Sequence, residues 1–139
     1  MKKLSIKKFA ILLAGQILGM FLISCGSVNV IEKQEDLPFT VISEECLSKE
    51  LLEIVEERKQ KPFKLTFSDQ GDFYIVQGYG EQNSGGYSIL VNALFRTANG
   101  IYIDTSLLGP KVGTPKSDIK TYPYIVVRTK DINLPVVFN

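Results

Sequence analysis

Hydrophobic residues change their spacing at Pro62, and this change constrains the fold more than any other feature of the sequence. Before Pro62, Leu47, Leu51, Ile54 and Val55 recur at the spacing of one helix face. After it, apolar residues mostly alternate with polar ones, in short runs separated by turn residues. One helix followed by strands with short connections predicts an α+β domain. We expect one amphipathic helix packed on a mostly antiparallel β-sheet of about six strands.

Local signals predict where these elements begin and end. Ser43, followed by Glu44 and Glu45, is typical of a helix N-terminus, because a hydroxyl caps backbone N–H groups and acids favour the first turn. Pro62 ends the helix. The expected strands span residues 37–43, 63–67, 73–79, 87–95, 101–108, 119–129 and 134–138. The continuous apolar start of the run at 73–79 indicates a strand that is buried on both faces.

The charge of the chain argues against binding to nucleic acid. The 139 residues carry a formal net charge of +1 and contain no histidine. Lys2, Lys3, Lys7 and Lys8 are four of the 16 basic residues, so the rest of the chain has 12 basic and 15 acidic residues and a net charge of −3. A mildly acidic protein is a poor ligand for phosphate backbones, and we expect no nucleic-acid partner.

The N-terminal segment has the pattern of an export signal. A basic stretch, residues 1–8, precedes an apolar run at residues 9–23, which is shorter than the roughly 20 residues of a membrane-spanning helix. The following Leu22-Ile23-Ser24-Cys25 resembles the bacterial lipobox. The resemblance implies cleavage after Ser24 and a diacylglycerol anchor on Cys25, with palmitate among its acyl chains. An ordinary signal peptide or an uncleaved anchor is the alternative.

The expected organisation follows from this signal. Residues 1–24 are a lipoprotein signal peptide, residues 25–36 a polar tether, and residues 37–139 one folded domain. We expect an extracytoplasmic protein, lipid-anchored in the cell membrane or cell envelope. Cys46 is then the remaining cysteine, and we interpret it as a small apolar residue at the start of the helix.

No pattern in the chain indicates catalysis. Without histidine, a serine nucleophile would need lysine as its base, and neither Ser84 nor Ser88 lies in a Gly-x-Ser-x-Gly context. Asp69 and Asp72 flank a predicted turn and lack the density of acids that a calcium loop requires. We therefore expect a protein that is not an enzyme, with no catalytic residues, no metal and no cofactor.

Two loop motifs stand out instead. The glycine-rich segment 78–86 is either a hairpin loop whose glycines supply positive φ angles or a bulge, or a surface that another backbone approaches closely. Tyr122-Pro123-Tyr124 interrupts a strand and marks an edge, a bulge or a cis bend, with a structural or a recognition role. The candidate partner-binding residues are Tyr79, Gly85, Gly86, Tyr87, Pro123 and Tyr124.

The same motifs carry a family resemblance. Gly85-Gly86-Tyr87-Ser88-Ile89, then Leu108-Gly109-Pro110, and then the stretch TYPYIVV at residues 121–127 resemble the C-terminal domain of the protease-complex subunit PrcB family. The resemblance covers roughly residues 73–138. It implies a small exported bacterial protein, often a lipoprotein, that is an accessory or assembly subunit of an exported protease complex.

A second similarity is to the chagasin-type cysteine-protease inhibitors. Those proteins use a Gly-Tyr or Gly-Phe loop and a Pro-Trp loop on a β-sandwich, which residues 83–87 and Pro123-Tyr124 echo. The chain differs from them in having no tryptophan and a prominent predicted helix. A protease inhibitor is therefore the alternative to a non-catalytic binding protein, and a hydrolase using Ser84 or Ser88 is a third reading.

Overall fold

The computed structural model describes residues 31–139, so the predicted signal peptide and Cys25 lie outside the described residues. In chain order the elements are β1 (Glu35–Asp36), β2 (Thr40–Val41), a 3-10 helix (Glu44–Cys46), α2 (Lys49–Arg58), β3 (Pro62–Asp69), β4 (Asp72–Tyr79), β5 (Ser88–Arg96), β6 (Ile101–Leu108), β7 (Tyr124–Lys130) and β8 (Val136–Phe138). Within these residues no helix has the length and apolar character needed to cross a membrane.

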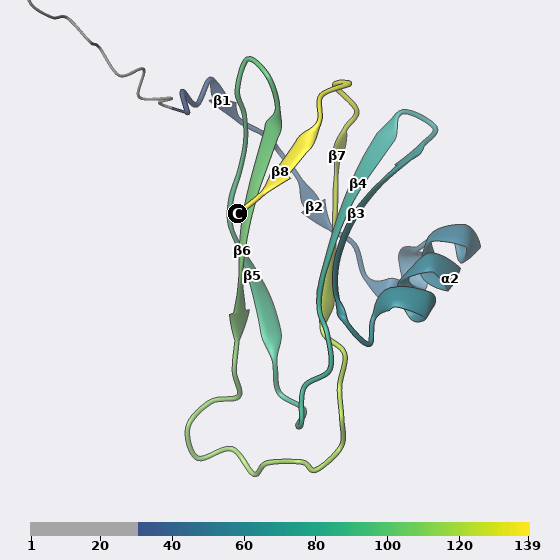
Figure 1. Cartoon of the computed structure of the whole chain (residues 1–139), viewed down its shortest axis with the longest axis vertical. Coiled ribbons are helices and arrows are strands. Elements are labelled where there is room, and N and C mark those ends of the chain that lie inside the picture. The colour runs from purple at the N-terminus through teal and green to yellow at the C-terminus, as the bar shows by residue number, and fades with distance from the viewer. Residues whose placement is uncertain (1–30) are drawn as a thin grey trace, which may run out of the picture. The chain divides into compact units, whose positions relative to one another are not determined.

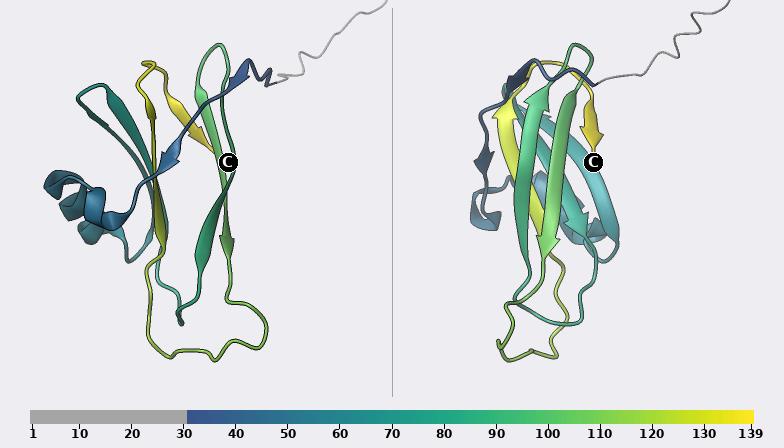
Figure 2. Two further views of the ribbon diagram at one scale, coloured as in Figure 1. Left: turned by 180° about the vertical axis from the view of Figure 1, so that it is seen from behind. Right: turned by 90° about the vertical axis from the view of Figure 1, so that its left-hand side faces the viewer.

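The strands form two facing sheets, and the helix covers one of them (Figures 1 and 2). Sheet A has the order β1-β5-β6-β8 and sheet B the order β2-β7-β4-β3. All neighbouring strands are antiparallel except the parallel pair β6 and β8. The predicted α+β class, with one helix and mostly antiparallel strands, is confirmed. The strands divide between two sheets of four rather than forming one sheet of about six.

Sheet B is buried on both faces, which explains the layering. On β4 the consecutive residues Ile75 and Val76 are each 0% exposed. Ile75 packs between the sheets with Leu94 and Ile103, whereas Val76 packs under the helix. Successive side chains of a strand point to opposite faces, so a continuous apolar strand needs cover on both sides. The prediction that residues 73–79 are buried on both faces is confirmed.

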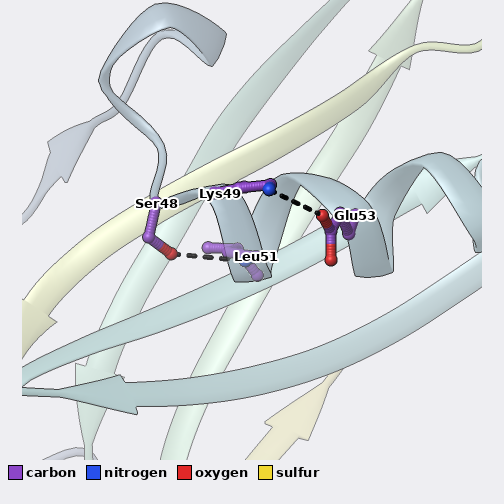
Figure 3. A network of polar contacts seen from close by, with 4 residues as sticks. All are labelled: Ser48, Lys49, Leu51 and Glu53. Atoms are coloured by element: carbon purple, nitrogen blue, oxygen red, sulfur yellow. Dashed lines mark hydrogen bonds and ion pairs between the residues drawn. The ribbon is translucent and has the colours of Figure 1, made fainter.

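The helix begins later than the sequence indicates. Ser43 precedes the 3-10 helix, and Ser48 caps α2, where the Leu51 backbone N–H donates to Ser48 Oγ over 3.2 Å (Figure 3). The next residue, Lys49, has its Nζ 3.9 Å from a carboxylate oxygen of Glu53, which lies one turn along the helix. The helix ends at Arg58, before Pro62, and its Leu51 and Val55 are buried as predicted.

The interpretation of Cys46 as an apolar residue at the start of the helix is wrong, because Cys46 is exposed to solvent and precedes α2. Cys46 is the last residue of the 3-10 helix, and its free thiol is exposed. Its recorded contact is a weak hydrogen bond from Ser43 Oγ to its sulfur over 3.6 Å.

The N-terminal part of the described chain switches between the sheets. β1 pairs with the end of β5, and β2 pairs with β7, where one strand over residues 37–43 is predicted. Pro38 lies at the switch, and its carbonyl accepts a hydrogen bond from Thr129 Oγ1 over 2.9 Å. β1 lies within the segment that the sequence analysis assigns to the tether. Because β1 and β2 are two residues each, they cover only part of the strands beside them.

Candidate protein-binding site

Two loops lie together at one end of the sandwich, at the bottom of Figure 1. The glycine loop, residues 80–87, connects β4 to β5, and the crossover loop, residues 109–123, runs from β6 in sheet A to β7 in sheet B. Together these end loops contain Gly85, Gly86, Tyr87 and Pro123, four of the six candidate residues. The sequence places the two segments far apart, and the fold brings them side by side.

Backbone hydrogen bonds join the end loops. Gln82 N donates to Thr121 O over 2.8 Å, and Thr121 N donates to Gln82 O over 3.0 Å. Thr121 Oγ1 also donates to the carbonyl of Ser84 over 2.7 Å. This short antiparallel bridge interrupts the predicted strand 119–129, which as a result begins only at Tyr124. Sequence reasoning did not identify Gln82 or Thr121, because a single long-range bridge leaves no local pattern.

An exposed ion pair reinforces the same junction. Lys120 Nζ lies 2.8 Å from a carboxylate oxygen of Glu81, and the Tyr122 hydroxyl lies 3.4 Å from the other oxygen. The hydrogen bond from Lys120 holds the pKa of Glu81 below its ordinary value. Because both side chains face solvent, salt screens this attraction, and the backbone bridge is the firmer link.

The two glycines of the motif have different roles. Gly86 has φ +86°, and a Cβ added there would lie 2.9 Å from the Cβ of Pro110. Residue 86 therefore needs glycine for its backbone conformation and for its contact with the crossover loop. A Cβ on Gly85 would meet nothing closer than Thr121 Cγ2 at 4.0 Å, so residue 85 has room for a small side chain. The positive φ angle predicted for the glycine-rich segment is found at Gly86, whereas the close approach of another backbone stays a prediction.

Tyr87 lies between two depressions. The end pocket is an open depression of about 480 Å³ between the two end loops, and it is lined by Asn83, Ser84, Tyr87, Pro110, Lys116, Ser117 and Asp118. The side groove, of about 270 Å³, lies between the starts of β5 and β7 and is lined by Val41, Tyr87, Ser88, Ile89, Pro123, Tyr124 and Ile125. Tyr87 is half-buried and contributes to both, as expected of a large amphipathic contact residue.

Tyr79 is engaged inside the sandwich rather than at the surface. Its hydroxyl lies 2.6 Å from Thr105 Oγ1, and Thr105 Oγ1 donates to Gln77 Oε1 over 2.9 Å. Since Thr105 has one hydroxyl proton, Tyr79 is the donor to Thr105. This chain of hydrogen bonds links β4 in sheet B to β6 in sheet A. A structural role accounts for Tyr79.

Pro123 and Tyr124 have different roles, although they are neighbours in the sequence. Pro123 precedes β7 in a trans peptide, and its carbonyl accepts a hydrogen bond from Tyr79 N over 3.0 Å. Tyr124 packs with the cluster under the helix, where its hydroxyl has no hydrogen-bond partner among residues 31–139. Burial, and secondly the charge of Glu44, raises the pKa of Tyr124 to about 12. Pro123 therefore belongs to the junction of the end loops, whereas the ring of Tyr124 supports the fold.

The serine and metal alternatives gain no geometric support among residues 31–139. Ser84 and Lys116 line the same end pocket, but no hydrogen bond joins the Ser84 hydroxyl to the Lys116 amine. Ser88 lies in the side groove. This part of the chain holds no group of three or more His, Cys, Asp or Glu side chains that could bind a metal ion.

The end loops lie in the part of the chain that matches a known family. The family model described as PrcB C-terminal matches residues 73–130, which include β4 to β7 and both end loops. No curated protein and no solved structure matches the chain. The resemblance predicted from the glycine and proline motifs is thus confirmed over residues 73–130, which match the PrcB C-terminal model.

Proposed function

We propose that this protein is a non-catalytic, lipid-anchored protein of the cell envelope that binds another protein through its end loops. The observation that carries the proposal is the junction of Gln82 with Thr121, which brings the glycine loop and the crossover loop, both within the matched residues 73–130, into one surface. Gly85 adds no side chain to that surface, and Tyr87 offers it a half-buried aromatic ring. Aromatic residues next to small ones are characteristic of loops that bind proteins.

The partner class comes from the family. The match to the PrcB C-terminal model supports an accessory or assembly subunit of an exported protease complex. To test this, lipidated protein is cross-linked in native membranes and its partners are identified by mass spectrometry. We expect an exported protease from the wild type and from Glu53→Arg on the outer face of α2, but not from Gly85→Arg, which places the same side chain on the end loops. Equal recovery from all three contradicts the proposal.

The anchor is proposed to be a diacylglycerol on Cys25, which carries the domain on the extracytoplasmic side. Two acyl chains anchor a protein stably where one chain binds only weakly. We expect Cys25→Ala to abolish labelling by radioactive palmitate, while Cys46→Ala, which alters the exposed cysteine of the domain, keeps it. Retained label in Cys25→Ala would end this part of the proposal.

A protease inhibitor remains the second candidate because of one observation. The segments that resemble the chagasin-type loops, residues 83–87 and Pro123, lie beside each other at the same end of a two-sheet sandwich. We expect progress curves of a purified papain-like cysteine protease to separate the two functions: slowed hydrolysis with the wild type, restored by Gly85→Arg, supports inhibition, and unchanged hydrolysis rules it out.

A further inference from the structure

Within residues 31–139, half of one edge of sheet A has no neighbouring strand. β1 pairs with β5 only at Arg96 and Phe95, and the last backbone hydrogen bond to this edge runs from Leu37 N to Leu94 O over 3.0 Å. Among the described residues no backbone or side-chain hydrogen bond reaches the same edge of β5 between Ser88 and Ala93. We call this stretch the open edge.

The backbone groups at the open edge can be identified from side-chain orientation. Along a strand, residues whose side chains point to one face direct their N–H and C=O groups to the same edge. Leu94 faces the core, and its carbonyl points to the β1 side. A bulge at Asn92 shifts the alternation, and below it Ile89 and Val91 are the residues that pack on the core. Ile89 and Val91 therefore direct two donors and two acceptors to the open edge.

The surroundings of the open edge combine uncharged polar and apolar surface. The side groove lies beside it, and no charged side chain lines that groove. Leu90 on β5 is 51% exposed and Val41 on β2 is 53% exposed, so apolar surface flanks the edge on both sides. Exposed sheet edges are ordinarily protected by charges or proline, and β3, the edge strand of sheet B, carries Pro62 and Lys64. Residues 88–93 of β5 contain neither.

We propose that the open edge of β5 receives an extended segment of the partner protein, which adds to sheet A as a further strand and places an uncharged apolar side chain in the side groove. Strand addition would pair the N–H and C=O groups of Ile89 and Val91 with another main chain in place of water. Tyr87 lines the side groove and belongs to the glycine loop, so the added strand would continue the surface of the end loops. The inference rests on the proposed function in one respect, that the partner is a protein.

Proline at position 91 tests the inference. Val91→Pro removes the N–H that faces the open edge, while the hydrogen bonds from β5 to β6 use other residues. Val91→Thr keeps the backbone N–H and has a side chain of similar size, so it is the matched control. The probe is a displayed library of short linear peptides, selected on the full chain in detergent. We expect enriched peptides with apolar residues at alternate positions, bound equally by the wild type and Val91→Thr and about tenfold more weakly by Val91→Pro.

Hydrogen exchange on the wild type decides the matter even if Val91→Pro does not fold. Bound peptide should slow the exchange of the Ile89 and Val91 amides. No enrichment, protection confined to other segments, or equal binding by Val91→Pro overturns the inference, and so does a self-association that Val91→Pro abolishes, because the occupant would then be a second copy. If Val91→Pro and the wild type capture the native partner equally while Gly85→Arg loses it, the proposed function is supported and strand addition at the open edge is refuted.

Discussion

Substituting Gly86 by alanine should destabilise the domain measurably. A side chain at φ +86° is strained by about 1–2 kcal/mol. The new Cβ would lie 2.9 Å from the Cβ of Pro110, and relieving such overpacking costs typically about 1–3 kcal/mol. Restricting the unfolded chain returns about 0.4–1 kcal/mol. We therefore expect Gly86→Ala to lower the free energy of unfolding by about 3 kcal/mol, which moves the urea midpoint down by roughly 1–3 M.

Gly85→Ala is the matched control next door. Its Cβ meets only Thr121 Cγ2 at 4.0 Å, so the free energy of unfolding should stay within about 0.5 kcal/mol of the wild type or rise slightly. The assay is equilibrium urea unfolding followed by circular dichroism. Equal destabilisation by both alanines, or none by Gly86→Ala, would refute the assignment of the positive φ angle and the Pro110 contact to Gly86.

Three further substitutions test the roles assigned to buried residues. Tyr79→Phe loses the hydrogen bond to Thr105 and should lower the urea-derived stability by about 1 kcal/mol while partner capture stays unchanged; lost capture at unchanged stability contradicts the structural role. Tyr124, with its pKa raised to about 12 by burial, ionises first in the unfolded chain, so stability should fall as the pH rises from about 10 to about 12. Tyr124→Phe should remove that fall without loss at neutral pH, and an identical pH profile for both proteins contradicts this. Leu51→Ala should cost about 2–5 kcal/mol because Leu51 is 1% exposed, against little change for Glu53→Ala, and similar unfolding midpoints for the two would refute the helix core.

Much of the fold could be predicted because the local patterns are strong. The helix stripe at Leu51 and Val55, the alternation of β3 and the double-sided burial of β4 all follow from spacing alone. The start of the helix was harder, since Ser43 and Ser48 are both plausible caps and only packing selects Ser48. The division into two sheets depends on which strands pair, and alternation does not specify a pairing partner.

The candidate site was predicted only in part, because local patterns indicate turns but not long-range contacts. Turn chemistry marked Gly86 and Pro123, which the fold places at the junction of the end loops. Tyr79 and Tyr124 carry identical side chains in similar motifs, yet one hydroxyl bonds across the sandwich and the other is buried without a partner. The bridge between Gln82 and Thr121 has no sequence signal, because it spans the whole of β5 and β6.

Mapping the cross-links between this chain and its captured partner tests the central claim most directly. Lys111, Lys116 and Lys120 lie on the crossover loop, whereas Lys49 lies on the helix and Lys64 on β3. If the end loops bind the partner, amine-reactive cross-links to it should concentrate on the three loop lysines. Cross-links confined to Lys49 and Lys64, with the loop lysines as reactive as in the free protein, would contradict the account.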